Sequence, residues 1–301
     1  MVEVTIAIPT FHRPKSLKWL LQAIAGLETD ANVSVLVADN DADGREGLAI
    51  CEAMKGTYRF PLTAIVVPER GIAQVRNALV DHARGDFIAM LDDDEWPERD
   101  WLTAFLRTQA ETGADVLQGS ILFGMTDKWA ASFDGLTDIR RATGPIDMLQ
   151  GAGNLLITRR ALDQIAKPWF DPAFALTGGE DHDFFVRLKR TGVRFAWCDE
   201  AIARGEVAVT RTSLRWALTR AYGVGNSDMR VFLKYGPTLS ERVREVARTA
   251  GALVLSPGLA AIHVFDVARR ADDLRRLARA AGKTAALLGF HYNAYSVTHG
   301  E

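Results

Sequence analysis

Cysteine is scarce in this chain. Cys51 and Cys198 are the only two among 301 residues, and they form neither a CxxC pair nor a cluster with histidines. A disulfide framework and a structural zinc site both need more of these side chains at short spacing. The sequence excludes both and is typical of reduced, buried thiols in a cytosolic protein.

An excess of charge of either sign is also missing. The 36 basic side chains nearly balance the 38 acidic ones, which gives a formal net charge of -2. Nucleic acid is held largely by a positive field that releases counterions from its phosphates. We therefore expect no nucleic-acid partner. The composition, 48% hydrophobic and 25% charged, also excludes a disordered, collagenous or coiled-coil chain.

No apolar run is long enough for a clean membrane span. The most apolar stretch, Thr249 to Phe265, carries Ser256-Pro257 in its middle and is shorter than the roughly 20 residues of a spanning helix. Two interpretations stay open: a buried helical hairpin, or an interfacial helix on an anionic membrane. The second is favoured by a basic run made of Arg269, Arg270, Arg275, Arg276, Arg279 and Lys283.

The start of the chain gives no sign of export. Pro9 leaves no room for a basic segment followed by the long apolar segment of a signal peptide. We expect a cytoplasmic protein, which the interfacial interpretation would place at the inner face of the cell membrane.

Short β-branched runs alternate with amphipathic helical stretches from Val2 to about Arg211. This alternation is typical of an α/β fold, a Rossmann-like and mostly parallel sheet flanked by helices. Helical spacing after Pro14 and after Ile72 predicts crossover helices, so the strands they join should run parallel. The predicted strands are Val4–Ile8, Val33–Ala38, Leu62–Val67, Phe87–Leu91, Asp115–Phe123 and Asn154–Thr158.

Two segments depart from this alternation. Gly124 to Gly151 is rich in Gly, Pro, Thr and Asp, which predicts a long loop that could recognise an acceptor. After Thr212 the strand pattern stops, and we place a domain boundary near Arg211. This gives a domain of residues 1–211 and a helical C-terminal extension of residues 212–301. Its predicted helices are Leu214–Tyr235, Leu239 to about Leu255, and Pro257 to about Ala281.

Four acidic residues, Asp92-Asp93-Asp94-Glu95, directly follow the strand Phe87–Leu91. They stand at the carboxyl end of a central strand, where open α/β sheets bind ligands. Adjacent carboxylates repel one another, so a divalent cation held by one or two of them together with substrate phosphates explains them best. The alternative is an acidic turn that caps the helix after Pro97.

Asp39 ends the second strand and should face the same crevice, where it could accept hydrogen bonds from a base or ribose. The alternative is a turn or N-cap aspartate. A calcium loop at this position is excluded, because a strand precedes it and its twelfth position is Ile50 instead of Glu. Gly151–Leu156 begins like a dinucleotide motif but ends in leucine and precedes a strand, so NAD binding is excluded. The sequence contains no P-loop lysine motif either.

Five short motifs follow one another along the chain: Ile8–Pro14, Val37–Asn40, Gly71–Asn77, Gly85–Asp94 and Gly179–Asp181. In this order and spacing they resemble the inverting glycosyltransferases of family 2, which have the GT-A fold, over the domain of residues 1–211. Three further segments look most like the exopolysaccharide glucosyltransferases of the succinoglycan type. These are Asp181–Phe185, Trp197–Glu200 and Arg211–Trp216.

The resemblance implies a role for each matched position. Asp181 matches the aspartate of a Glu-Asp pair that serves as base, and Glu180 would orient the acceptor. Asp94 matches the last carboxylate of the Asp-x-Asp motif, which binds manganese or magnesium in this family. The implied contacts to the sugar nucleotide are Pro9, Thr10, Arg13, Asp39, Arg76, Asp92 and Asp93, with Thr10 and Asp39 at the positions that hold uracil and ribose.

Elementary chemistry agrees with these roles. Inversion needs one carboxylate base, whereas a glycosidase needs two flanking carboxyl groups. The departing diphosphate gains negative charge, which a cation at Asp94 would stabilise. Arg211, Arg215 and Arg220 either close over that diphosphate or form a solvated helix face. Trp129, in the long loop, is the best candidate for a sugar contact, although packing explains most of the tryptophans.

The expected activity is transfer of a hexose, glucose by the resemblance, from a UDP-sugar with inversion. The acceptor would be a saccharide or a lipid-diphosphate-linked oligosaccharide in polysaccharide biosynthesis. One alternative is a nucleotidyltransferase, although its Gly-rich, Arg-containing loop after the first strand is missing here. Another is a non-catalytic nucleotide-sugar-binding module, which the presence of both Asp94 and Asp181 disfavours.

Overall fold

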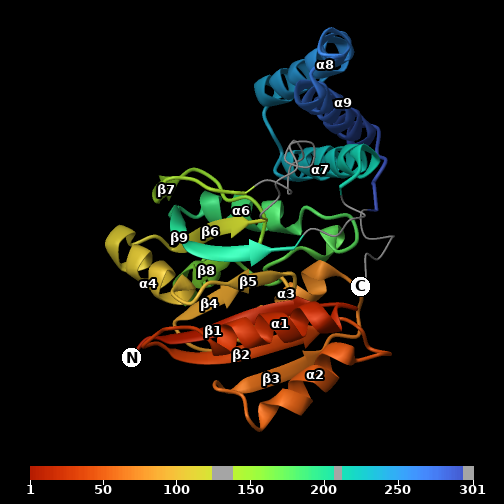
Figure 1. The fold of residues 1–301 in the computed structure, drawn as a ribbon. Helices are drawn as coiled ribbons and strands as arrows, with labels where there is room; N and C mark the ends of the chain where they lie inside the picture. Colours follow the sequence, from red (N-terminus) through yellow and green to blue (C-terminus); the bar gives the residue numbers. More distant parts are fainter. Residues whose placement is uncertain (124–137, 207–211, 294–301) are drawn as a thin grey trace.

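The computed structural model describes residues 1–123, 138–206 and 212–293. One mixed sheet runs through this part in the order β3-β2-β1-β4-β8-β6-β9-β5, with β7 paired to β9 (Figure 1). The strands are β1 (Glu3–Thr10), β2 (Asn32–Asp39), β3 (Leu62–Val66), β4 (Phe87–Met90), β5 (Glu95–Pro97), β6 (Val116–Leu122), β7 (Gly144–Ile146), β8 (Leu155–Thr158) and β9 (Phe195–Gly205).

Helices cover both faces of the sheet, and each face has its own hydrophobic core. Alternate residues of each strand point to opposite faces, so Val33, Val35 and Val37 of β2 enter one core while Leu36 and Ala38 enter the other. The first core also contains α1 (Pro14–Ala25), α2 (Glu46–Lys55) and α4 (Trp101–Thr112); the second contains α3 (Ile72–His82), α5 (Arg159–Leu162) and α6 (Glu180–Arg190). A short 3-10 helix, Pro172–Phe174, precedes α6.

The predicted α/β class is confirmed, with one difference in the sheet. Strands β1 to β4 run parallel to one another, as the two crossover helices indicated. Beyond β4 the sheet becomes mixed, because β8 runs antiparallel between β4 and β6. Local sequence pattern cannot reveal this insertion, since β8 reaches its place after the segment that was predicted as a loop.

That loop prediction is wrong in its second half. Residues 144–146 form β7, which pairs antiparallel with β9, and Ile139 forms an isolated bridge with Ile121. Gly144 and Pro145 concealed this strand, because both residues are rare inside sheets but tolerated at an edge. Residues 124–137 lie outside the described part of the chain.

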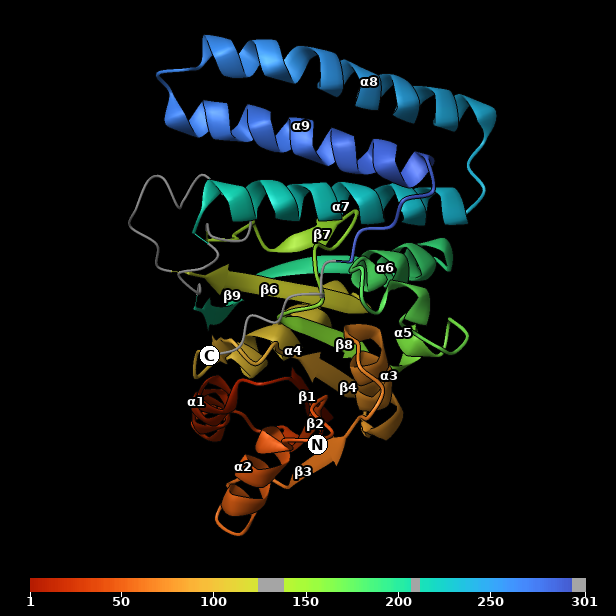
Figure 2. The same cartoon turned by 90° about the vertical axis from the view of Figure 1, so that its right-hand side faces the viewer.

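Three long helices form a layer beyond the sheet: α7 (Leu214–Lys234), α8 (Leu239–Ile262) and α9 (Val267–Leu287). Figure 2 shows α9 lying between α7 and α8. Glycines allow the α7 and α9 backbones to touch, since a Cβ at Gly225 would clash with the Arg279 carbonyl and one at Gly282 with the Tyr222 carbonyl. Asn226, only 1% exposed, donates to the carbonyls of Gly282 and Phe290. The three helices therefore form one compact layer.

The outermost helix corrects two predictions. Helix α8 continues through Pro257 and ends at Ile262, so the expected break at Ser256-Pro257 is absent. The small residues Ser256 and Ala260 are buried against the layer, and this packing offsets the hydrogen bond that proline cannot donate.

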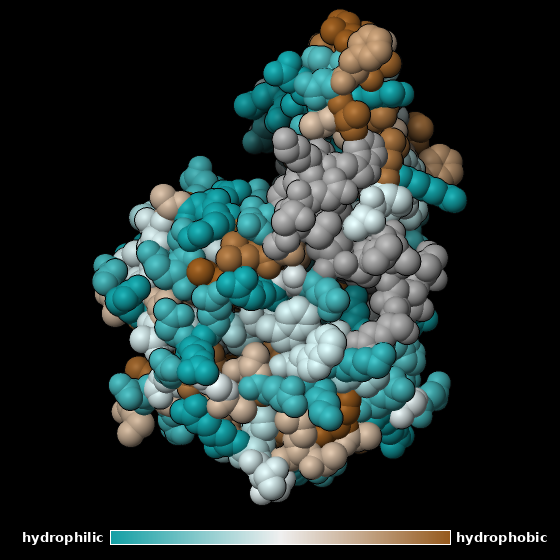
Figure 3. All heavy atoms as spheres, viewed as in Figure 1, coloured by the Kyte–Doolittle hydropathy of each residue, from teal (hydrophilic) through white to brown (hydrophobic). Residues whose placement is uncertain are grey.

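The buried-hairpin interpretation is also wrong, because the most apolar residues of α8 and of the turn after it face outward. Figure 3 shows apolar residues gathered at the top of the molecule. They include Val254, Leu255, Ile262 and Phe265, which are 76%, 63%, 74% and 97% exposed. We call these four residues the outer α8 face. No helix in the described ranges is both long and apolar enough to span a bilayer.

Candidate active site

The parallel register brings the predicted motifs together at one edge of the sheet. Thr10 and Asp39, the last residues of β1 and β2, are paired, and so are Pro9 and Ala38. The Leu91 amide donates to the Ala7 carbonyl, which carries the chain after β4 to the same edge. Thr10 and Asp39 therefore stand beside the acidic motif that follows Leu91, as the sequence predicts.

The acidic motif is compensated by a neighbouring arginine. Asp93 is 6% exposed and accepts a hydrogen bond of 2.8 Å from the Thr10 hydroxyl. Arg13 Nη1 lies 2.9 Å from Asp93 Oδ1 and 2.6 Å from Asp94 Oδ2. Burial raises the pKa of Asp93 to about 7, although Arg13 opposes the shift. Burial opposes the charge of Arg13 in turn, but Asp94 and Asp93 hold its pKa above the usual range.

Arg76 connects the acidic motif to the Glu-Asp pair. This side chain belongs to α3, is 6% exposed, and lies 2.5 Å from Glu180 Oε1 through Nη1 and 3.3 Å from Asp92 Oδ1 through Nη2. Glu180 is 2% exposed, and burial followed by the charge of Asp181 raises its pKa to about 7. One arginine thus holds two motifs that are far apart in the sequence.

Asp181 lies in the first turn of α6. Gly178 and Gly179 precede it with φ of 74° and 97°, a left-handed conformation that glycine adopts without strain. The Asp181 carboxylate accepts the His182 amide at 2.7 Å through Oδ1. Its Oδ2 faces the Gly151 side, where an added Cβ would lie 3.8 Å away. The carboxylate is partly exposed and belongs to a helix N-terminus, where negative charge is favourable.

Asp39 is more enclosed than the crevice interpretation suggests. It is 1% exposed and accepts the amides of Asp41 and Leu48, each at 3.0 Å. Gly47 packs so closely that a Cβ there would lie 2.9 Å from Asp39 Oδ2. This geometry matches the alternative of a turn aspartate, and direct contact with ribose stays a prediction.

An aromatic surface beside Thr10 was missed by sequence reasoning. The Arg70 guanidinium lies 5.1 Å from the centre of the Phe11 ring, which lies 4.1 Å from the His12 ring. Phe11 belongs to the motif Ile8–Pro14, and Arg70 directly precedes the motif Gly71–Asn77. Their positions inside or next to two motifs were the available signal, but nothing local indicated that the two side chains meet.

The remaining predicted contacts fall into two groups. Arg220 is exposed on α7 and lies 5.6 Å from the centre of the Trp216 ring, and Arg215 is also exposed on the same helix. Trp129 and Arg211 lie outside the described residues. All four assignments therefore stay predictions.

The acidic motif fits a divalent cation that shares its ligands with a substrate. The side chains of Asp92 and Asp94 are 36% and 23% exposed, so their oxygens, which hard cations prefer, can reach a ligand. In the part of the chain that the structure describes, no three His, Cys, Asp or Glu side chains converge on a point that could hold a metal. One or two carboxylates plus phosphate oxygens suit manganese or magnesium, whereas an all-protein cage does not fit here.

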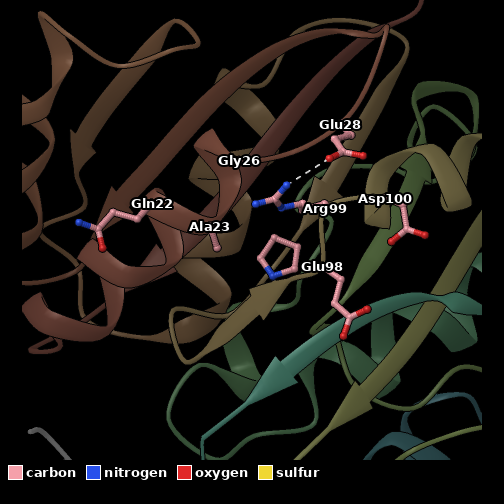
Figure 4. Close-up of a pocket in the computed structure, with 8 residues that line it drawn as sticks. Gln22, Ala23, Gly26, Glu28, Glu98, Arg99 and Asp100 are labelled. Carbon is pink, nitrogen blue, oxygen red and sulfur yellow. Dashed lines mark hydrogen bonds and ion pairs between the residues drawn. The ribbon is translucent and has the colours of Figure 1, made fainter.

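A separate hollow of about 660 Å³ lies between α1 and the start of α4 (Figure 4). Glu28 and Arg99, paired at 3.4 Å across it, are 69% and 80% exposed. This hollow is not lined by any of the described residues that were predicted for the site. We assign it no role in the candidate site.

Comparison with known proteins identifies the family of this chain. Residues 5–164, more than half of the chain, match the family model described as glycosyl transferase family 2. The chain is 30% identical over 313 aligned positions to the succinoglycan biosynthesis protein ExoM of Rhizobium meliloti strain 1021, covering 99% of this chain and 98% of that protein.

Solved structures show the same architecture. The mannosyltransferase PcManGT from Pyrobaculum calidifontis, in complex with GDP-Man and Mn2+, has a TM-score of 0.65 at 16% identity, covering 95% of this chain and 87% of that one. TarS 1–349 from S. aureus, in complex with UDP-GlcNAc, has a TM-score of 0.53 at 14% identity, covering 96% and 93%. The chain therefore belongs to glycosyltransferase family 2 and has the GT-A fold, a mixed sheet flanked by helices with helices at its C-terminus.

Proposed function

We propose that this glycosyltransferase moves a hexose, with glucose as the first candidate, from a UDP-sugar to a saccharide acceptor with inversion at the anomeric carbon. The observation that carries the proposal is the Arg76 bridge, which links Asp92 of the acidic motif to Glu180 of the Glu-Asp pair. A sugar nucleotide bound along the acidic motif would thereby place its anomeric carbon near the first turn of α6.

Asp181 is the proposed base. Its partly exposed carboxylate takes the proton of an acceptor hydroxyl while that oxygen attacks the anomeric carbon. The bond from the anomeric carbon to the diphosphate breaks, and UDP leaves with the bonding electron pair. Glu180 is buried against Arg76. We therefore propose that Glu180 affects the acceptor indirectly, by fixing the shape of the first turn of α6.

The acidic motif and its surroundings are proposed to hold the donor. Asp94, with Asp92, would hold manganese or magnesium, and the cation when bound supplies positive charge that stabilises the departing diphosphate. Thr10, Arg13 and Asp93 form the wall beside it. The Phe11 ring, with Arg70 over it, offers a face on which the uracil could stack.

The resemblance to ExoM, a protein of succinoglycan biosynthesis, supports a role in making exopolysaccharide. We infer that the acceptor is an oligosaccharide linked to lipid through a diphosphate. Such an acceptor is presented at a membrane surface, so the proposal includes peripheral attachment at the inner face of the cell membrane.

The outer α8 face is the proposed membrane contact. Ile262 and Phe265, at the end of this face, shortly precede Arg269, which is 71% exposed, and exposed Arg270 at the start of α9. Apolar side chains that enter the headgroup region beside basic residues are typical of helices that lie on anionic membranes. Of the basic run, only the part next to this face, Arg269 and Arg270, would thus contribute to membrane binding.

A panel of donors tests the proposed function. Thermal unfolding is measured with UDP-, GDP- and dTDP-sugars, with and without manganese, because a ligand that binds only the folded state raises its melting temperature. We expect the largest shift with a UDP-sugar plus manganese, and release of UDP when an acceptor is added. A larger shift with a GDP- or dTDP-sugar would overturn the choice of nucleotide, and no shift with any donor would overturn the function.

The same assay tests the metal ligand. Asp94→Asn should fold normally and lose the manganese-dependent part of the shift, because an amide lacks the charge that a hard cation needs. Asp30→Asn, which changes an exposed acid in the turn before β2, is the control and should keep that part. Unchanged manganese dependence in Asp94→Asn would remove this residue from the metal site.

A further inference from the structure

Hydrogen bonds from α7 and its C-terminal end hold the segment that carries Asp181. Ser227 donates to the Gly178 carbonyl at 2.9 Å, directly before α6. Asp183, which is fully buried, accepts hydrogen bonds from Lys234 Nζ at 2.6 Å and from the Tyr235 hydroxyl at 2.7 Å. Both sides of Asp181 in the sequence are therefore attached to the same helix of the C-terminal layer.

A chain of charged groups extends this attachment to α9. His182 Nδ1 lies 3.2 Å from Asp228 Oδ1 on α7. The other carboxylate oxygen of Asp228 accepts from Arg279 Nε at 3.1 Å and from Nη2 at 2.5 Å. Asp228 is thus shared between a histidine adjacent to the proposed base and an arginine on the middle helix of the layer.

The Arg279 end of this series of contacts is rigid. Arg279 belongs to the turn of α9 whose backbone touches Gly225 of α7, so its guanidinium starts from a fixed point. The near end is sensitive, because the His182 amide donates to the Asp181 carboxylate at 2.7 Å. A rotation of the peptide group between residues 181 and 182 would therefore change the direction in which the Asp181 carboxylate points.

We propose that Asp228 is a positioning residue for sugar transfer: held by Arg279, it anchors His182 and so fixes the first turn of α6 with Asp181 directed at the acceptor. The C-terminal helices are, on this view, part of the active site. The proposal rests on the proposed function for its effect on turnover, while its structural half is measurable without any reaction.

The first test compares two isosteric variants in the full-length protein. Asp228→Asn weakens the contacts from α9 through α7 to His182 on α6. Glu245→Gln weakens a similar ion pair, to Lys283 between α8 and α9, which lies away from α6. The two acids are comparably enclosed, with side chains 19% and 16% exposed. With UDP-glucose, manganese and a saccharide acceptor, Asp228→Asn should lower kcat about tenfold, the size expected for one hydrogen bond between charged groups. Donor affinity should hold, and Glu245→Gln should keep its kcat.

The second test needs no turnover. Hydrogen exchange at the amides of Asp183 to Phe185 should become about tenfold faster in Asp228→Asn and in His182→Ala. His182→Asn should restore slow exchange, because its amide nitrogen can occupy the place of Nδ1. Glu245→Gln serves again as the control and should leave these amides unchanged.

The outcomes separate the two proposals. Absence of UDP release in the wild-type protein, with exchange behaving as expected, would overturn the proposed function and leave the anchoring intact. Unchanged exchange in both Asp228→Asn and His182→Ala would overturn the positioning role, as would equal losses of kcat in Asp228→Asn and Glu245→Gln. Failure of His182→Asn to restore slow exchange would show that the Nδ1 contact is not the anchor.

Discussion

The candidate site at the sheet edge and the outer α8 face are opposite in character. At the candidate site, charged side chains are buried: Arg76 is 6% exposed and Glu180 is 2% exposed. On α8, large apolar side chains are exposed, up to 97% at Phe265. Folding alone favours the reverse arrangement in both places, since buried charge and exposed apolar surface each raise the free energy of the folded state.

The two regions deal with this cost differently. At the candidate site, the buried acids Asp93 and Glu180 face cations of the same chain, Arg13 and Arg76 respectively. In the described ranges, no element packs over the outer α8 face. The buried charges of the candidate site are balanced within the chain, whereas the apolar side chains of the outer α8 face are left exposed, as the proposed membrane contact requires.

The largest effect should come from the proposed base. Asp181→Asn keeps size and polarity but removes the proton acceptor, so turnover should fall by at least the roughly hundredfold typical of general base catalysis, while UDP-sugar affinity hardly moves. Glu180→Gln is the matched comparison and should have a milder effect, because Glu180 is buried against Arg76. UDP release and donor affinity are measured side by side for both.

Two results would contradict this assignment. Near-normal turnover in Asp181→Asn together with a large loss in Glu180→Gln would exchange the roles within the pair. Normal turnover in both would show that neither carboxylate is the base.

A smaller effect is expected on the other side of the comparison. Replacing Ile262 and Phe265 by Ser should weaken binding to phosphatidylglycerol vesicles by at least about tenfold, since each apolar side chain contributes more than about 1 kcal/mol when fully buried. Wild-type binding should also weaken as salt increases. Leu239→Ser, at the opposite end of α8 and 77% exposed, is the control. Vesicle binding that is absent at low salt, or equally weakened by Leu239→Ser, would contradict the proposed contact.

The smallest effect concerns the charge of His182. Its contact with Asp228 raises the pKa of His182 above 6.5, helped by Asp181 and opposed by burial and by Arg279. Burial opposes the charge of Asp228, but His182 and Arg279 hold the pKa of this acid below 3.8. A raised histidine pKa stabilises the fold below 6.5 and loses this contribution as pH rises; a lowered aspartate pKa loses its contribution as pH falls below 3.8.

Wild-type protein should therefore exceed His182→Asn in stability most clearly between pH 4 and 6.5, in the window set by these two pKa values. The excess should be below about 1 kcal/mol, because the imidazole is partly exposed and the pair is screened. Thermal unfolding across pH measures it. An excess that grows above pH 8 would contradict the direction of the histidine shift.

The sequence alone predicted which strand ends meet at the candidate site, for a physical reason. The carboxyl ends of parallel strands meet at one edge, so Thr10, Asp39 and the acidic motif could be brought together from strand positions alone. The same logic failed for Arg76, whose contacts to Asp92 and Glu180 depend on where α3 and α6 pack and not on any spacing in the sequence.

The helical layer was predicted less well. Helical periodicity shows that α8 has an apolar side but not whether another element covers it, and the sequence interpretation as a buried hairpin was wrong. Pro257 was taken as a helix end, although tertiary packing carries α8 through it. The attachment of Asp228 to His182 joins residues far apart in the sequence, and neither residue belongs to a pattern that links them.

The order of the layers bears on how the chain is made. Helix α8 precedes α9 in the sequence, yet it packs on α9, which in turn packs on α7. During synthesis from the N-terminus, α8 leaves the ribosome before Val267–Leu287 does, so α9 cannot yet cover its inner side. Until then both sides of the helix are open to water, and such exposed apolar surface makes folding intermediates prone to aggregate. A membrane that received the outer side at this stage would shelter that side of the helix before α9 packs against the inner side.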